Sequence, residues 1–349
     1  MQYRTLGKTD ISVSLITLGT MTYGEQNTQA EAFEQMDYAI DNGVNTIDVA
    51  EMYPVPPRES TFGASEVIVG RWLAERGMRD QVVLATKVTG NGINNPGFEY
   101  IRGGPRPSAV QIRQAINDSL GRLQTDYVDL YQIHWPDRQA NFFGRLGCES
   151  LDKKAQIIPL EETVATLGEL LKAGKIRHYG LSNETPWGIM EACRVADKLA
   201  LPRPVSVQNP YNLLNRTYEI GLAEISLREN IGLLAYSPLA FGRLSGKYYN
   251  GALPAGSRLA RYDRFTRYNS PYAKAAADAY VDLALKHQVD PSELALAFVN
   301  QQEFVASNII GATTLAQLDT NIRSVKLRLS DDLLLGIAAL HQQYCNPAP

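Results

Sequence analysis

Eight short apolar runs recur along the chain, and after each run the apolar residues switch to helical spacing. The runs, which we expect to be strands, are 14–20, 45–50, 82–88, 127–134, 176–182, 205–208, 232–237 and 308–311. Strict alternation of strand and helix is typical of a parallel sheet, because each helix returns the chain to the same end of the sheet. Eight such units predict a closed (β/α)8 barrel, the TIM barrel, in the α/β class.

The segments between these strands carry the helical pattern. The expected helices are 29–42, 64–75, 108–123, 160–173, 186–199, 217–229, 273–287, 292–301 and 315–325, with an extra C-terminal helix over 331–344. An open, doubly wound sheet is the competing interpretation. Such a sheet normally carries a GxGxxG fingerprint after its first strand, and the chain has none.

The chain of 349 residues is longer than the roughly 250 residues of a simple barrel. We expect the surplus in an N-terminal β-hairpin over 3–12, in the extra helix, and in long irregular stretches at 54–62, 135–159 and 240–271. The last two follow the fourth and seventh strands. Since loops after barrel strands lie at the face that carries chemistry, we expect a site there. No linker divides the chain, so a single domain over 1–349 is predicted.

Composition narrows the class of protein. The 34 basic and 37 acidic residues give a net charge of −3, which argues against a nucleic-acid partner. There is no apolar run of membrane-spanning length and no apolar leader after Met1, so we expect neither a membrane nor a secreted protein. Cys148, Cys193 and Cys345 are widely spaced, which favours a reduced, cytoplasmic protein. The sequence leaves the oligomeric state open.

Four polar residues stand at or just after strand ends: Asp48, Tyr53, Lys87 and His134. Taken singly, each has a structural interpretation, such as a turn cap, loop packing, a solvated strand end or a satisfied core histidine. A barrel brings the carboxyl ends of its strands to one mouth, so these four are expected to converge. The four histidines of the chain are scattered, and no metal site is predicted.

Several motifs then follow one another in a familiar order. They are Ile47–Tyr53 (IDVAEMY), Leu84–Lys87 (LATK), Tyr127–Pro136 (YVDLYQIHWP), Gly180–Asn183 (GLSN), Gln208–Asn212 (QNPYN), Ala235–Leu239 (AYSPL), Gly242–Tyr248 (GRLSGKY) and Gly311–Asn321 (GATTLAQLDTN). This series resembles the aldo-keto reductase superfamily over essentially the whole chain. With its insert after His134 and its Pro-Ala-Pro end, the chain is most similar to the bacterial Tas-type branch.

The resemblance implies an NADPH-dependent reductase of a small aldehyde or ketone. Hydride addition leaves negative charge on the carbonyl oxygen, which needs a positioned acid. By resemblance Tyr53 is that acid, Lys87 lowers its pKa from about 10, Asp48 holds Lys87, and His134 orients the carbonyl. Substrate would contact Tyr53, His134 and Trp135. Some relatives are ion-channel accessory subunits, so a cofactor-binding regulatory module is the alternative; a metal-dependent barrel hydrolase is disfavoured.

The resemblance also implies a set of cofactor contacts. Ser182, Asn183 and Gln208 would bond the nicotinamide carboxamide, and Tyr236 would stack on its ring. The remaining implied contacts are Gly19, Thr20, Met21 and Asp48 on the early strands, Ser237, Pro238, Leu239, Gly242, Leu244 and Lys247 over the pyrophosphate, and Gly311, Thr313, Gln317 and Asn321 at the adenosine end.

Many relatives carry a basic residue for the 2′-phosphate near Gly311 or Thr313, and this chain has none there. Arg323 or an arginine of the long loop are the candidates for that charge. In that loop an arginine recurs every three residues, at Arg258, Arg261, Arg264 and Arg267. The residue directly after each of the last three is aromatic: Tyr262, Phe265 and Tyr268. This pattern has three interpretations, in order of preference: aromatic residues that pack on the barrel, a clamp on the cofactor phosphates, and binding of single-stranded nucleic acid. The insert 136–159 is either a partly apolar lid or a surface excursion or oligomer contact.

Overall fold

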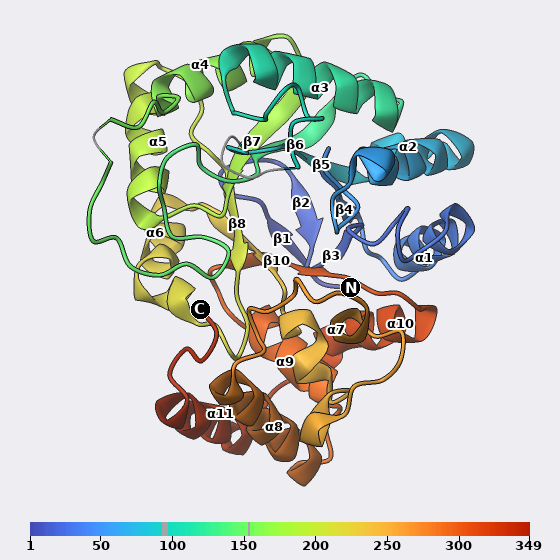
Figure 1. Cartoon of the computed structure of the whole chain (residues 1–349). Coiled ribbons are helices and arrows are strands. Elements are labelled where there is room, and N and C mark those ends of the chain that lie inside the picture. The colour runs from blue at the N-terminus through green and yellow to red at the C-terminus, as the bar shows by residue number, and fades with distance from the viewer. Residues whose placement is uncertain (93–96, 153) are drawn as a thin grey trace.

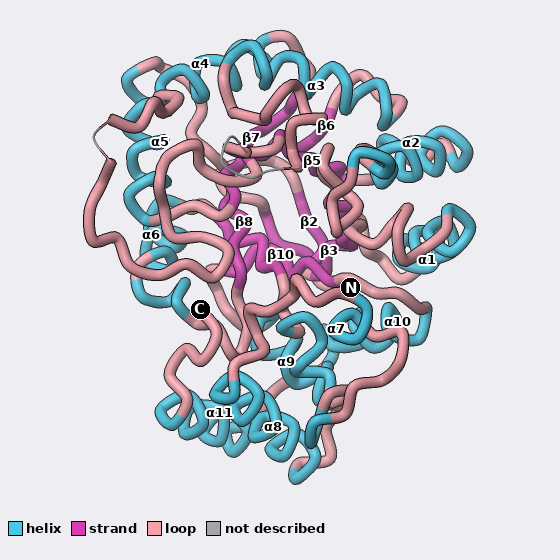
Figure 2. Tube along the Cα trace, in the orientation of Figure 1, coloured by secondary structure: helices cyan, strands magenta, loops and turns pink. Residues whose placement is uncertain are grey.

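The computed structural model describes residues 1–92, 97–152 and 154–349. Its centre is a closed barrel of parallel strands in the order β10-β3-β4-β5-β6-β7-β8-β9 (Figure 2). The strands are β3 (Ile16–Gly19), β4 (Thr46–Asp48), β5 (Val83–Val88), β6 (Val128–Ile133), β7 (Ile176–Ser182), β8 (Ser206–Pro210), β9 (Gly232–Tyr236) and β10 (Val305–Ile310). The predicted TIM barrel is confirmed.

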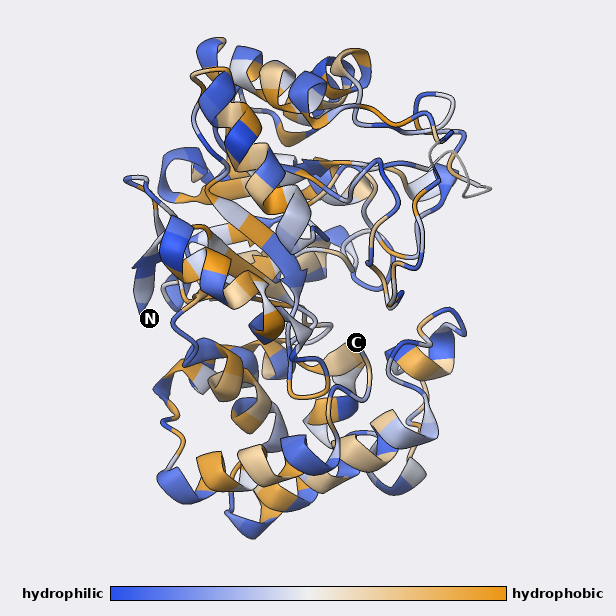
Figure 3. Cartoon of the chain, turned by 90° about the vertical axis from the view of Figure 1, so that its left-hand side faces the viewer, coloured by the Kyte–Doolittle hydropathy of each residue, from blue (hydrophilic) through white to orange (hydrophobic). Residues whose placement is uncertain are grey.

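Helices surround the barrel on its outer side (Figure 1). The helices of the structure are α1 (Gln29–Asp41), α2 (Ala64–Arg76), α3 (Ala109–Leu123), α4 (Leu160–Lys172), α5 (Pro186–Lys198), α6 (Leu222–Glu229), α7 (Arg258–Arg261), α8 (Pro271–Lys286), α9 (Pro291–Asn300), α10 (Leu315–Arg323) and α11 (Asp331–Gln343). Of these, α7 lies in the segment after β9, and α11 packs on α8. Apolar and polar residues alternate along these helices (Figure 3), because one face of each packs inward. Helix α11 is the expected C-terminal helix.

Side-chain caps fix where several helices begin. Thr28 and Glu31 form a reciprocal capping box at the start of α1. Thr185, Ser270 and Thr314 each accept a backbone N–H of the first turn, at α5, α8 and α10 respectively. These helix starts follow loops that lead out of the barrel mouth, so the caps also define where those loops end.

The N-terminal hairpin closes the other end of the barrel. Strands β1 (Tyr3–Thr5) and β2 (Ser12–Ser14) pair antiparallel, and apolar hairpin side chains pack on residues from the barrel strands. Gly7 has φ +59°, and a methyl group built on it would lie 2.6 Å from the carbonyl oxygen of Val205. Only glycine allows the hairpin turn to approach the barrel this closely. The hairpin leaves the opposite mouth as the accessible one.

Some expected boundaries were wrong. Ser14 belongs to the hairpin, so β3 starts at Ile16, and β10 starts at Val305 rather than 308 because its first residues pair with β9. The expected helix 217–229 is a 3₁₀ turn followed by α6, separated at Gly221, whose φ is −162°. The expected helix 315–325 ends at Arg323 and continues as a 3₁₀ turn.

Candidate active site

A pocket of about 1230 Å³ opens at the carboxyl end of the barrel strands. Its lining comes from strand ends, from the insert after β6, from the segment after β9 and from the start of α10. Strand register explains the convergence: Gly19 pairs with Asp48, Lys87 with Gln132, and Ser182 with Gln208. Residues far apart in the chain therefore occupy one layer of the barrel.

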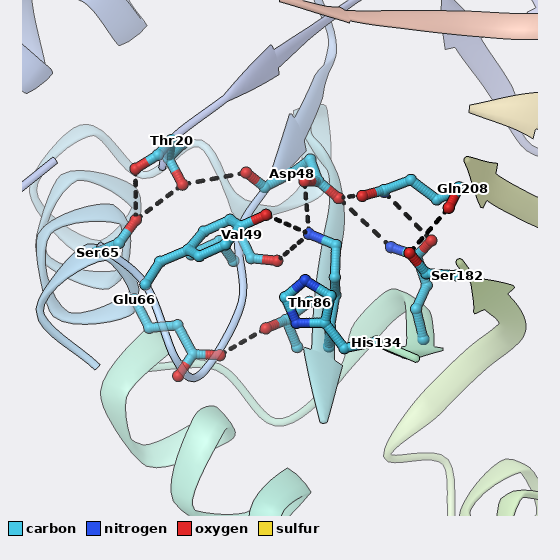
Figure 4. Close-up of polar contacts among 12 residues, drawn as sticks. Thr20, Asp48, Val49, Ser65, Glu66, Thr86, His134, Ser182 and Gln208 are labelled. Atoms are coloured by element: carbon cyan, nitrogen blue, oxygen red, sulfur yellow. Dashed lines mark hydrogen bonds and ion pairs between the residues drawn. The ribbon is translucent and has the colours of Figure 1, made fainter. Parts of the chain in front are cut away.

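Asp48 is the centre of a buried network at the floor of this pocket. Its Oδ2 lies 2.6 Å from Lys87 Nζ, and its Oδ1 accepts from Gln208 Nε2 at 2.9 Å (Figure 4). Lys87 also donates to the carbonyl oxygen of Val49 at 2.9 Å. Lys87 is completely buried and Asp48 is 2% exposed. A buried ion pair that forms further hydrogen bonds is held in a fixed geometry, which suits a site that must position reacting groups.

Tyr53 and His134 lie next to this pair. The Tyr53 hydroxyl is 3.4 Å from Lys87 Nζ, and the rings of Tyr53 and His134 meet edge to face with centroids 5.8 Å apart. His134 Nδ1 has no hydrogen-bond partner among the described residues. The structure thus brings the four predicted catalytic residues together, with Asp48, Tyr53 and His134 on the pocket wall and Lys87 behind them.

Burial sets the protonation of these groups. It raises the pKa of Tyr53 well above its usual 10.0, and the negative charge of Asp48 raises it further. This corrects the expectation that Lys87 lowers the pKa of Tyr53: in the free protein desolvation prevails, and Asp48 neutralises the lysine. Burial and the Lys87 charge hold the pKa of His134 well below 6.5. Tyr53 is a neutral phenol and His134 a neutral imidazole near pH 7.

The predicted carboxamide contacts form the next part of the floor. Ser182 donates to the Gln208 backbone carbonyl at 2.8 Å, and Asn183 Nδ2 donates to that of His134 at 2.8 Å. Tyr236 donates its hydroxyl to Asn183 Oδ1 at 2.6 Å. Asn183 adopts a left-handed backbone, φ +52°, which asparagine tolerates better than most residues. Amide and hydroxyl groups are therefore presented side by side, as a carboxamide ligand requires.

Most of the other implied cofactor contacts also line the pocket. These are Gly19, Met21, Ser237, Pro238, Leu239, Gly242, Lys247, Gly311, Thr313, Gln317 and Asn321. Asn321 Nδ2, Gln26 Nε2 and Ser257 Oγ are shielded lining atoms that have no partner among the described residues. Buried polar atoms left unpaired on a pocket wall fit a polar ligand such as a dinucleotide.

Two implied contacts are not on the pocket. Thr20 Oγ1 points away, sharing a hydrogen bond with Ser65 Oγ at 2.8 Å and donating to the Asp48 carbonyl (Figure 4). Leu244 is 1% exposed and belongs to the apolar core beside α8 and α9. Each stands close in sequence to residues that line the pocket, Gly19 and Met21 around Thr20 and Gly242 and Ser245 around Leu244. Their own side chains point into the protein instead.

The segment 258–268, which carries the repeated arginines and aromatic residues, agrees with two of the three interpretations. Phe265 and Tyr268 are buried against Phe241, with ring centroids 5.0 and 4.8 Å apart. Three arginines of the series, Arg258, Arg264 and Arg267, line the pocket, whereas Arg261 does not. Arg323 is removed from the pocket and pairs with Glu293 and Asp319. The charge facing a ligand therefore comes from the long loop.

The insert after β6 contributes one side of the pocket. Trp135 and Phe143 line it, with their rings edge to face at 5.6 Å. Beyond Phe143 the insert is exposed, including Leu146, Cys148 and Leu151. Residue 153 of the insert lies outside the described residues. Only the first part of the insert, up to Phe143, therefore agrees with the interpretation as a partly apolar lid.

Two buried ion pairs behind the site are not predicted by the sequence. Glu51 binds Arg102 in a fork at 2.7 and 2.7 Å and accepts from the Thr89 N–H, while Glu66 accepts from Arg122 and from Thr86. Both glutamates are 0% exposed. Nothing in the sequence distinguishes them from surface carboxylates. Their position between strand ends and α2 or α3 is visible only in the fold.

Within the described ranges, no helix is both long and apolar enough to cross a bilayer. The same residues contain no group of three or more His, Cys, Asp or Glu side chains that is arranged to hold a metal ion.

Comparisons with known proteins agree with this geometry. The aldo/keto reductase family matches residues 15–341. Protein tas of Escherichia coli is 52% identical over 349 residues, covering all of both chains. An aldo-keto reductase of Babesia bovis is 38% identical over 282 residues, 76% of this chain and 98% of its own. A probable voltage-gated potassium channel subunit beta of Arabidopsis thaliana is 31% identical over 341 residues, 93% of this chain and 91% of its own.

Proposed function

The chain belongs to the aldo/keto reductase family, an oxidoreductase family, and on that premise we propose that it reduces an aldehyde or ketone to the alcohol with NADPH. The observation that carries the proposal is the contact series Asp48–Lys87–Tyr53, at 2.6 and 3.4 Å, on the floor of a pocket large enough for cofactor and substrate together. The proposal treats residues 1–349 as one catalytic domain.

A nicotinamide cofactor bound in this pocket supplies a hydride. The protein then has to deliver a proton to the carbonyl oxygen, and the Tyr53 hydroxyl holds one because burial keeps its pKa high. Lys87 lies 3.4 Å from that hydroxyl and stabilises the phenolate as the proton leaves. Asp48 keeps the ammonium in place. Neutral His134, with Nδ1 unpaired, orients the carbonyl oxygen, and Trp135 walls the substrate.

The residues fit the cofactor at both ends. Ser182, Asn183 and Gln208 present hydroxyl and amide groups for a carboxamide, and Asn321 has an unpaired buried amide at the far side of the pocket. The N-terminus of α10 lies there as well, and the positive end of a helix dipole favours an anion. NADPH is proposed over NADH because Lys247, Arg258 and their neighbours give this pocket positive charge for an additional phosphate.

The alternative is a cofactor-binding accessory module, which the 31% identity to a channel-subunit relative brings into consideration. The assembled Asp48, Tyr53, Lys87 and His134 favour turnover. We propose a cytoplasmic location, since the chain has three cysteines and all are free thiols, two of them exposed.

Oxidation of NADPH, followed by absorbance against a panel of aldehydes and ketones, tests the proposal. Tyr53→Phe is the key variant, with NADPH binding measured in parallel by fluorescence. Turnover in the parent and its loss in the variant support the reductase. Tight NADPH binding without turnover on any carbonyl favours the accessory module, and comparison of NADPH and NADH affinities decides the cofactor.

A further inference from the structure

The pocket has an excess of positive charge. The cations on its wall are Lys247, Arg258, Arg264 and Arg267, and the carboxylates are Asp48 and Asp290. Asp48 is bonded to Lys87, and Asp290 accepts the backbone N–H groups of Ser292 and Glu293 at the start of α9. Within the described part of the chain, none of the four cations forms an ion pair. The pocket of a chain with net charge −3 is therefore locally cationic.

Two of these cations lie at the cofactor end. A methyl group built on Gly242 would meet Lys247 Cε at 2.7 Å, so the lysine lies against the loop assigned to the pyrophosphate. The Arg258 guanidinium lies 5.9 Å from the centre of the Phe241 ring in that same loop. The phosphates of the cofactor account for both charges.

Arg267 lies on the other side, where substrate would enter. A methyl group built on Gly144 would lie 3.5 Å from Arg267 Nε, so this arginine adjoins the insert residue that follows Phe143. It also hydrogen-bonds the Tyr236 and Tyr268 side chains. Its segment is anchored by Tyr268, which is completely buried. Arg267 is half-buried and held in position.

Arg264 is more exposed and faces the same region. Its charge acts on the phenol of Tyr100, whose ring stacks on that of Phe98 with centroids 6.3 Å apart. Phe98 also lines the pocket and meets Trp135 edge to face at 6.4 Å. Both arginines therefore line the same pocket as the aromatic wall, while Phe265 and Tyr268, which follow them in the chain, pack on Phe241.

The aromatic wall itself is rigid. Trp135 donates its indole N–H to the carbonyl oxygen of Asn91 at 2.9 Å and is 4% exposed. Gly90 lies so close that a methyl group built on it would be 2.5 Å from the indole ring. The rings of Phe98 and Phe143 both meet the indole edge to face. This surface suits the flat apolar face of a ring.

We propose that the substrate is an anionic carbonyl compound, with a ring-sized apolar body against Trp135 and a carboxylate bound by Arg264 and Arg267. The planar guanidinium fork matches a carboxylate, and a cation that forms no ion pair within the described residues gains most from one. This inference rests on the proposed reductase function and adds the substrate class to it.

The test compares 4-carboxybenzaldehyde with its neutral methyl ester, which has the same ring and the same aldehyde. The variant is the double substitution Arg264→Met with Arg267→Met, and Arg261→Met is the matched control from the same segment. We expect the parent to prefer the carboxylate roughly 10- to 100-fold in kcat/KM, and the double variant to lose most of that preference. Arg261→Met should keep it. A second arm, glyceraldehyde 3-phosphate against glyceraldehyde, shows whether phosphate serves as the anion.

Equal use of the charged and neutral aldehydes by the parent overturns the inference and leaves the reductase intact. An increased NADPH Kd in the double variant with an unchanged substrate preference also overturns it, because the arginines then serve the cofactor. If no aldehyde is reduced, the reductase proposal fails, and calorimetry still tests the arginines. In that case 4-(hydroxymethyl)benzoate is titrated into NADP⁺-saturated protein: binding weakened about tenfold by the double variant supports the anion site, and no binding overturns it.

Discussion

Asp48 uses its two carboxylate oxygens for two different tasks: Oδ2 binds Lys87 at 2.6 Å and Oδ1 accepts from Gln208. Lys87 in turn lies 3.4 Å from the Tyr53 hydroxyl, while Gln208 belongs to the residues proposed to hold the nicotinamide. One buried side chain thereby links the proposed proton donor to the residues proposed to hold the cofactor.

Removing the Tyr53 hydroxyl should abolish the proton source and leave the ring in place. Tyr53→Phe is expected to lower kcat by about 10²–10⁴ with little change in NADPH affinity, measured by steady-state kinetics and fluorescence titration. Tyr179→Phe is the control, because that buried tyrosine bonds the carbonyl of Pro202, outside the pocket. Comparable kcat for Tyr53→Phe and the parent protein would exclude Tyr53 as the acid.

The pH dependence of reduction should be flat near neutrality. Burial raises the pKa of Tyr53 above 10.0, so the acid stays protonated, and burial with the Lys87 charge keeps the pKa of His134 well below 6.5. We expect kcat/KM at saturating cofactor to be constant between about pH 6 and pH 9. An inflection near pH 6.5 that disappears in His134→Gln would show that the imidazole titrates there.

The Glu51–Arg102 pair should stabilise the fold in a pH-dependent way. Burial alone would raise the pKa of Glu51, but hydrogen bonds and charge from Arg102 and the Thr89 N–H outweigh it and lower the pKa below 4.5. The stabilisation is present above the unfolded pKa of about 4.5 and is lost as the pH falls through the lower folded pKa. Glu51→Gln should cost about 3–5 kcal/mol of unfolding free energy at pH 7, measured by denaturant titration.

A surface pair provides the comparison for that substitution. Arg113 and Glu169 form an ion pair at 2.7 Å with side chains 46% and 57% exposed. Glu169→Gln should change the free energy of unfolding by less than about 1 kcal/mol. Equal effects of the two substitutions would contradict a structural role for the buried pair.

Gly242→Ala should weaken cofactor binding. Gly242 has φ +91°, and a methyl group there would displace Lys247 Cε, which lies 2.7 Å away. Displacing this ammonium should raise the NADPH Kd about tenfold, measured by fluorescence titration. Gly251→Ala is the matched control: its φ is +80°, so it carries a similar backbone cost, and nothing lies within 4 Å of the added methyl. Both variants should lose a little stability, but only the first should lose cofactor affinity.

The sequence predicts the barrel well because its signal is local: each strand is an apolar run and each helix has an apolar face. It also predicts the four residues on strand ends, since a parallel barrel places them at one mouth. The sequence does not predict which way a side chain points, and therefore which residues of a segment face the pocket. Thr20 and Leu244 are close in sequence to lining residues, yet their side chains point into the protein.

Buried charged residues are the second feature that the sequence does not predict. Glu51 and Glu66 look like solvated carboxylates in the sequence, because their partners Arg102 and Arg122 are more than fifty residues away. The direction of the Tyr53 pKa shift also differs from the expectation, since it depends on how thoroughly the folded chain excludes water. These properties come from packing between elements, which no local pattern records.

The floor of the pocket and its rim come from different parts of the chain. Asp48, Lys87 and Gln208 stand on barrel strands, whereas Phe143, Arg264 and Arg267 belong to excursions that leave the barrel and return to it. On the proposed function, such modular construction would allow the excursions to be exchanged or redesigned for a different carbonyl compound while the reaction chemistry is retained. A change at Asp48, by contrast, would disturb the proposed proton delivery and cofactor placement in a single mutational step.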